Sequence, residues 1–79
     1  MSTQALVPPE TRKALGQKIK SLRLQQGWSQ VKMAQLAGMH DGHLGEVERG
    51  EIDACLSTLG KIVGPLKTSV ADLFEGAGS

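Results

Sequence analysis

The side chains that could carry chemistry are concentrated between residues 23 and 51 of this 79-residue chain. His40, Asp41 and His43 are residue types that bind transition metals, and two histidines three positions apart can share one face of a helix. Three such residues on a short segment, with no fourth ligand nearby, are weak evidence for a bound ion, so we expect no metal site. The chain also has no recognisable nucleophile–base pair and no phosphate-binding glycine loop, and we therefore expect neither an enzyme nor a cofactor.

The segment that must position these side chains runs from Gly27 to Gly50 and has the pattern of two short helices joined by a turn. Ser29 can cap a first helix over residues 30–37 by accepting hydrogen bonds from its free N–H groups. Gly38 then supplies the positive φ that ends many helices. A second helix over residues 41–49, with His40 near its cap, carries Leu44 and Val47 three apart, where both can pack inward.

Three more short helices are expected around this pair, giving an all-α fold of five helices. Pro9 is tolerated in a first helical turn, which predicts a helix from there to about Gln26. A fourth helix is expected to begin around residues 55–57 and to kink or stop at Gly64–Pro65, because proline removes a backbone donor. Ser69, with Asp72 three positions on, predicts the start of a last helix over residues 70–75.

Length and composition are those of one small domain. A chain of this size buries only roughly 60–65% of its unfolded surface, which leaves little room for an enclosed catalytic cleft. We expect a flexible arm over residues 1–8, a folded domain over 9–75 and a disordered tail over 76–79. Cys55 is the single cysteine and excludes an intrachain disulfide. Because neither a signal peptide nor an apolar membrane span is recognisable, we expect a cytoplasmic protein with no membrane partner.

The stretch from Leu15 to Phe74 resembles the phage repressor and Cro-like helix-turn-helix family, the XRE-type small bacterial regulators with a lambda-repressor-like domain. The resemblance implies a regulator of transcription that binds operator DNA as a homodimer, with the second helix of the pair in the major groove. The matching residues are Leu22-Arg23, Gly27, Ser29-Gln30, Ala34, Ala37-Gly38, Glu48-Arg49-Gly50, Leu59, Leu66 and Asp72-Leu73-Phe74.

The resemblance also assigns individual roles. Arg23 and Glu48 match a structural ion pair between the first and third helices. Gln30 matches a residue that contacts a DNA phosphate, and its alternative role is that of a solvated polar side chain. With Leu44 and Val47 turned inward, helical geometry predicts that Gly42, Gly45, Glu46 and Arg49 face outward. The expected DNA-binding residues are Ser29, Gln30, His40, Asp41, Gly42, His43, Gly45, Glu46 and Arg49.

The charge distribution is unusual for such a surface. Residues 1–39 carry six Lys or Arg and one Glu, whereas residues 40–56 carry one Arg and five Asp or Glu. Carboxylates can accept from the amino group of cytosine, but they repel phosphates. A second interpretation is therefore a regulator that binds another protein through this fold.

Three apolar residues belong to that second interpretation. Val31 and Leu36 are expected either to cover the edge of the core or to form part of a protein contact, and Phe74 is a further candidate contact. We expect the helix that contains Phe74, with the C-terminal segment, to supply the contact between the two copies of a homodimer. Trp28 is expected to anchor the core between the first two helices, the alternative being base stacking.

Overall fold

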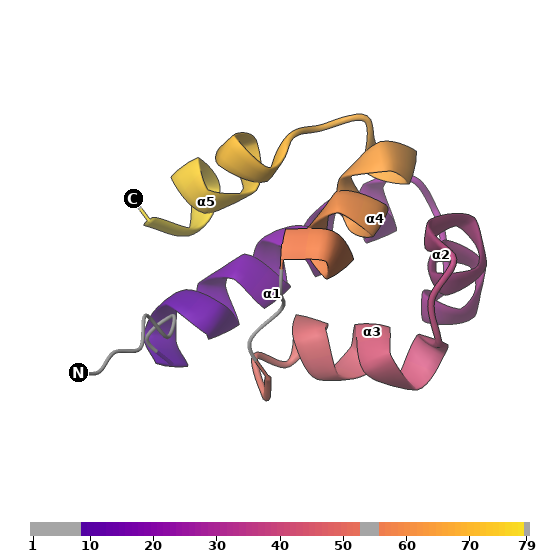
Figure 1. Ribbon diagram of the computed structural model, residues 1–79, viewed down its shortest axis with the longest axis horizontal. Coiled ribbons are helices and arrows are strands. Elements are labelled where there is room, and N and C mark those ends of the chain that lie inside the picture. The colour runs from indigo at the N-terminus through magenta and orange to yellow at the C-terminus, as the bar shows by residue number, and fades with distance from the viewer. Residues whose placement is uncertain (1–8, 53–55, 79) are drawn as a thin grey trace.

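The computed structural model describes residues 9–52 and 56–78, and within these ranges it consists of five helices (Figure 1). Three parts of the chain lie outside the described residues: the predicted arm over residues 1–8, the loop residues 53–55, which include Cys55, and Ser79. The helices are α1 (Pro9–Gln25), α2 (Gln30–Ala37), α3 (Asp41–Glu48), α4 (Leu56–Leu66) and α5 (Val70–Gly78). None of them is long and apolar enough to cross a bilayer.

The longest helix, α1, lies between the pair α2–α3 and the C-terminal helix. It contacts α3 on one side and α5 on another, while α2 contacts α3 and α4 (Figure 1). One apolar core joins all five helices, because each of them supplies at least one fully or almost fully buried side chain. The buried core residues are Leu15, Ile19, Met33, Ala34, Leu44, Val47, Leu59, Ile62, Leu66 and Leu73.

The two caps predicted for α2 are present. The Ser29 Oγ accepts a 3.0 Å hydrogen bond from the backbone N–H of Lys32, which supplies one partner to the open helix start. Gly38 has φ of 70°, the left-handed conformation, and its N–H donates to the last turn of α2. These local features set where α2 ends and how the chain turns into α3.

The last helix does not end where predicted, and of the two outcomes expected at Gly64–Pro65, a kink or a stop, the stop is not observed. Helix α4 does not stop at Gly64–Pro65 but continues to Leu66, where Lys67 takes a left-handed φ of 56°. Pro65 falls in the last turn, so only one intrahelical hydrogen bond is lost there. Helix α5 extends past Glu75 to Gly78 and takes in most of the segment expected to be a disordered tail. Its start at Val70 is as predicted, and the Ser69 Oγ accepts from the Asp72 N–H at 3.1 Å.

A glycine in the middle of α1 sets how closely α1 and α3 approach. A Cβ on Gly16 would stand 2.3 Å from the carbonyl oxygen of Glu48 and 2.5 Å from that of Val47. Only a residue without a side chain permits this approach, because real Cβ atoms do not come so near a backbone oxygen. Gly16 therefore places the carboxyl end of α3 directly on α1.

Candidate nucleic-acid interface

Helix α3 presents one face to the core and the opposite face to solvent. Leu44 and Val47 are buried, as their spacing predicted. On the outer side, Asp41, Gly42 and Arg49 are exposed. His43 and Glu46 are half-buried, and the His43 Nδ1 lies 3.7 Å from the Glu46 Oε1, a contact that is an ion pair when the histidine is protonated. His40 is the exposed N-cap residue and makes no side-chain cap hydrogen bond.

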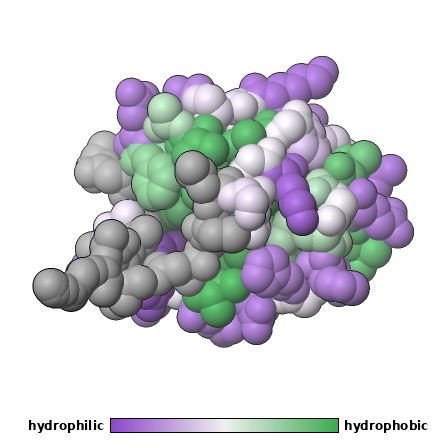
Figure 2. Space-filling model, in the orientation of Figure 1, coloured by the Kyte–Doolittle hydropathy of each residue, from purple (hydrophilic) through white to green (hydrophobic). Residues whose placement is uncertain are grey.

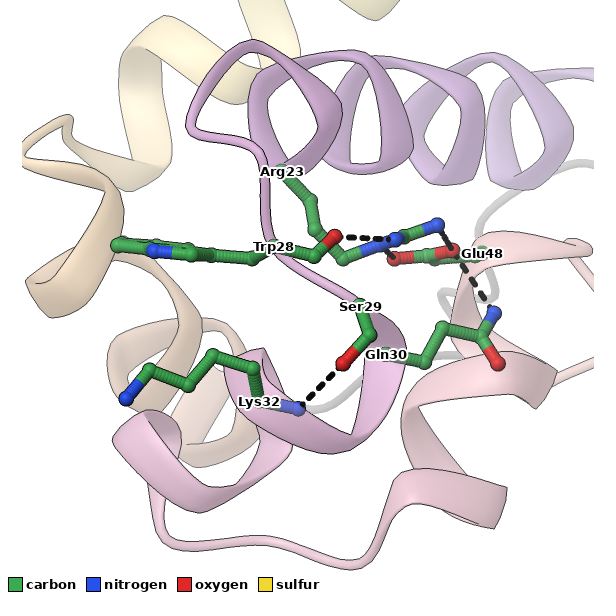
Figure 3. Close-up of polar contacts among 6 residues, drawn as sticks. All are labelled: Arg23, Trp28, Ser29, Gln30, Lys32 and Glu48. Carbon is green, nitrogen blue, oxygen red and sulfur yellow. Dashed lines mark hydrogen bonds and ion pairs between the residues drawn. The ribbon is translucent and has the colours of Figure 1, made fainter.

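The ion pair between Arg23 and Glu48 is confirmed and is part of a larger buried network (Figure 3). The Arg23 Nε donates to the Glu48 Oε2 at 2.7 Å and the Arg23 Nη2 donates to Oε1 at 3.1 Å, the two parallel bonds typical of a guanidinium on a carboxylate. The third nitrogen, Nη1, donates to the Trp28 carbonyl at 2.7 Å. The side chains of Arg23 and Glu48 are 7% and 2% exposed. This network fixes α3 against α1 and against the start of α2.

Gln30 belongs to the same network. Its Nε2 donates a 3.0 Å hydrogen bond to the Glu48 Oε1, and the side chain reaches from the first residue of α2 across to α3 (Figure 3). Gln30 is therefore not simply a solvated polar residue. Glu48 accepts a hydrogen bond from the amide nitrogen of Gln30. The side chain of Gln30 is half-buried and lies beside the outer face of α3.

Gly45 lies on the outward side of α3, as expected, but it is buried. The position where its Cβ would lie is 3.0 Å from the Arg49 Nη1 and 3.5 Å from the Gln30 Oε1. Helical geometry alone directs this position away from the core, but the two long side chains lie over it. Because Gly45 has no side chain, the side chains of Gln30 and Arg49 can lie directly over the backbone of α3 at this position.

The carboxyl end of α3 combines an exposed ion pair with two cations from α1. The Arg49 Nε donates to the Glu51 Oε2 at 2.8 Å, and Nη2 donates to Oε1 at 3.2 Å. This mutual hydrogen bonding raises the pKa of Arg49 and lowers that of Glu51. Beside them, the Arg12 Nε donates to the Gly50 carbonyl at 3.3 Å, and the Lys13 backbone and stem lie against Gly50, which has φ of 72°.

Four residues of this arrangement make contacts that the sequence did not predict: Gly16, Arg12, Lys13 and Glu51. Glycine inside an otherwise regular helix pattern was the available signal for Gly16, because such a residue costs about 1 kcal/mol relative to alanine and usually has a packing reason. The placement of Arg12 and Lys13 beside Gly50 depends on tertiary packing, so no local pattern in the sequence indicates it.

The apolar residues left open by the sequence divide into two groups. Val31 and Leu36 of α2 are 52% and 45% exposed, so they do not cover the core edge. Trp28 and Phe74 are partly buried and pack on the core, in agreement with the core role expected for Trp28. Figure 2 shows hydrophobic atoms among hydrophilic ones at the right edge, over α2, and a mainly hydrophilic surface at the lower edge, over α3.

No cluster of three or more His, Cys, Asp or Glu side chains with metal-binding geometry is found within residues 9–52 and 56–78. The side chains around α3 that the structure describes offer groups for hydrogen bonding and charge interactions. Amide, imidazole, carboxylate and guanidinium groups are the groups with which proteins contact base edges and phosphates.

Comparison with known proteins identifies the fold. A helix-turn-helix family model, HTH_3, matches residues 19–73. The control protein C.SmaI of Serratia marcescens is 33% identical over 69 residues, which cover 87% of this chain and 82% of C.SmaI. The sequence prediction of a regulator, and not an enzyme, agrees with this relative.

Solved structures give the same result. The clp gene regulator ClgR from C. glutamicum superposes with a TM-score of 0.81 at 28% identity, covering 96% of this chain and 95% of ClgR. The restriction-modification controller protein C.AhdI from Aeromonas hydrophila gives a TM-score of 0.74 at 31% identity, covering 77% of this chain and 92% of C.AhdI. The chain therefore belongs to the HTH_3 helix-turn-helix family of transcriptional regulators, as its resemblance to the phage repressor and Cro-like proteins predicted.

Proposed function

We propose that this regulator binds a two-fold operator as a homodimer and reads base sequence with α3 in the major groove. The observation that carries the proposal is the way α3 is packed against the rest of the domain. Its inner face is held by Leu44, Val47 and the buried Glu48, while Asp41 and Gly42 at its amino end are exposed. A rigidly held helix with an exposed amino end is what major-groove reading requires.

Phosphate contacts have to come from the flanks, because α3 itself carries carboxylates. Arg12 and Lys13 of α1 lie beside Gly50, at one end of α3, and Lys32 is exposed on α2. Cations at these places can neutralise phosphates on either side of the groove. The half-buried amide of Gln30, together with the hydroxyl of Ser29, supplies neutral phosphate contacts at the start of α2.

The outer residues of α3 favour particular bases. The carboxylates of Asp41 and Glu46 can accept hydrogen bonds from the amino group of cytosine, and the imidazoles of His40 and His43 can donate to acceptors of guanine. The side chain of Arg49 can donate to guanine or to phosphate. We therefore expect an operator with G·C pairs under α3.

The homodimer would place two copies of α3 about one DNA turn apart, roughly 34–36 Å. We assign the contact between the copies to α5. Phe74 is partly buried on its own core and retains an exposed portion, so a second copy could cover the remainder of its ring. The relatives named as control or controller proteins support a regulatory role of this kind.

The test is selection of duplexes from a random library, followed by fluorescence anisotropy with the selected duplex and with a scrambled one across a salt series. We expect a palindromic selected site and a selected duplex that binds at least 10³-fold more tightly than the scrambled one. His43→Ala should lose roughly 5- to 100-fold in specific affinity, as the removal of a base contact does. Lys61→Ala, an exposed change on α4, is the matched control. Absence of any preferred sequence at low salt contradicts the proposal.

The oligomeric state is tested separately by sedimentation equilibrium. We expect a dimer in the micromolar range, and Phe74→Ala should shift the equilibrium towards monomer while the helical circular dichroism is retained. A wild-type chain that stays monomeric both free and on the selected site would contradict the homodimer.

A second candidate function, docking on another regulatory protein, is favoured by the exposure of Val31 and Leu36. These residues are five apart, which places them about 140° apart around α2, so they border the helix on two sides rather than form one stripe. Loss of a stoichiometric partner on Leu36→Glu, with folding and DNA binding intact, would support this function. Retention of every captured partner by Leu36→Glu would count against it.

A further inference from the structure

The exposed pair formed by Arg49 and Glu51 is held in place by the end of α3. The N–H of Gly50 donates to the Val47 carbonyl at 3.1 Å, and the N–H of Glu51 donates to the Glu46 carbonyl at 3.0 Å. With Gly50 at φ of 72°, these two bonds turn the chain back so that Glu51 stands beside the guanidinium of Arg49. Backbone hydrogen bonds therefore set where Glu51 lies relative to Arg49, independently of their side chains.

The guanidinium lies across the outer surface of α3. Its Nε and Nη2 atoms donate to Glu51, and its Nη1 atom lies 3.0 Å from the position where a Cβ on Gly45 would be. The Gln30 Oε1 is 3.5 Å from the same position. Arg49 is thus located between Glu51 on one side and the start of α2 on the other, within the surface proposed to face DNA.

The pair is accessible to solvent, so another anion can replace Glu51 as the partner of Arg49. The Arg49 and Glu51 side chains are 57% and 52% exposed. An exposed ion pair is weak in water, and a phosphate presents the same fork of two oxygens to a guanidinium as a carboxylate does. A DNA phosphate and the Glu51 carboxylate therefore compete for one binding partner.

We propose that Glu51 is an internal competitor that occupies Arg49 in the free protein and so lowers both the affinity and the salt dependence of DNA binding. This inference rests on the proposed function. The free chain presents Arg49 as a neutral pair, so that Arg49 adds little to phosphate neutralisation until Glu51 is displaced or changed.

The test compares the wild type with Glu51→Gln, which keeps the shape and removes the charge. One additional neutralised phosphate steepens the slope of log K against log salt by about 0.9 for each DNA-bound copy. Over the decade from 1 M to 0.1 M salt this corresponds to roughly an eightfold gain in affinity per copy. Gln25→Lys at the end of α1 raises the net charge by the same amount at an exposed position outside the proposed DNA surface and outside α5, and serves as the matched control, with no change expected.

Arg49→Ala and the double variant Arg49→Ala/Glu51→Gln decide the mechanism. If Glu51 acts by occupying Arg49, the gain from Glu51→Gln disappears in the Arg49→Ala background. A gain of the same size in that background shows that Glu51 acts only by its own repulsion of phosphate, and the inference is overturned. The inference is also overturned if the wild type binds DNA and Glu51→Gln gains no affinity. If the wild type binds no duplex even at low salt, the proposed function itself is rejected.

A readout on the free protein separates the pairing from DNA binding. The Nε–H nuclear magnetic resonance signal of Arg49 should be shifted and protected from exchange in the wild type, because this hydrogen is donated to Glu51. Glu51→Gln should weaken both effects, and Gln25→Lys should leave them unchanged. An Arg49 signal that is identical in the wild type and in Glu51→Gln would mean that no pair exists to compete with DNA.

Discussion

Gly16 of α1 lies against the backbone carbonyl of Glu48, so closely that a Cβ on Gly16 would stand 2.3 Å from that oxygen. We expect Gly16→Ala to force α1 and α3 apart. Overpacking of this kind costs about 1–3 kcal/mol, and the better helix propensity of alanine offsets up to about 1 kcal/mol of it. The free energy of unfolding measured in urea should fall, and DNA binding should weaken with it because α3 is displaced.

Gly60 of α4 provides the matched substitution. A Cβ on Gly60 meets nothing within 4 Å, so Gly60→Ala should raise the free energy of unfolding by about 0.5–1 kcal/mol through helix propensity alone. Equal effects of the two glycine changes would show that the contact between Gly16 and Glu48 does not limit packing.

The buried ion pair gives a second prediction about stability. Removing one partner leaves the other charge buried and unpaired, which costs about 3–5 kcal/mol. We therefore expect Arg23→Met and Glu48→Met each to destabilise the chain strongly in denaturant unfolding. The double variant Arg23→Met/Glu48→Met should be less destabilised than the sum of the single effects, because no charge is then stranded. Strict additivity would argue against a coupled pair.

Local signals in the sequence were sufficient for most of the fold. Ser29 and Gly38 bound α2 because a cap and a left-handed residue act within one turn, and the spacing of Leu44 and Val47 fixed the inner face of α3. The pairing of Arg23 with Glu48, 25 residues apart, came from the family resemblance and not from periodicity. Both kinds of prediction agree with the structure.

The rest of the site depended on where long side chains lie after folding. Gly45 is buried by the side chains of Gln30 and Arg49, and a helical wheel does not show the direction in which either side chain extends. Glu51 meets Arg49 across a left-handed glycine just beyond the end of α3, where helical spacing no longer applies. The extension of α5 to Gly78 runs against the low helix propensity of its two final glycine positions, Gly76 and Gly78.

Glu46 gives a prediction about specificity. It is half-buried on the outer side of α3, and a carboxylate there accepts from the amino group of cytosine. Glu46→Ala should relax the preference at one base pair of each half-site, with a loss of discrimination of about 1–3 kcal/mol. The measurement is competition between selected duplexes that differ only at that pair. A uniform change for all sequences would show that Glu46 acts through phosphate repulsion and not through base reading.

The pH dependence of the pair at the end of α3 follows from its geometry. Hydrogen bonding to Arg49 lowers the pKa of Glu51 below the range usual for an unfolded glutamate, about 4.3. A lowered pKa in the folded state means that the pair contributes to stability above the unfolded value and loses that contribution as the pH falls through the folded one. The carboxyl carbon signal of Glu51 should therefore titrate at a lower pH in the wild type than in Arg49→Ala. Lys61→Ala, which removes a cation from α4, should leave the Glu51 midpoint unchanged, and an equal midpoint in Arg49→Ala would show that the two side chains do not pair in solution.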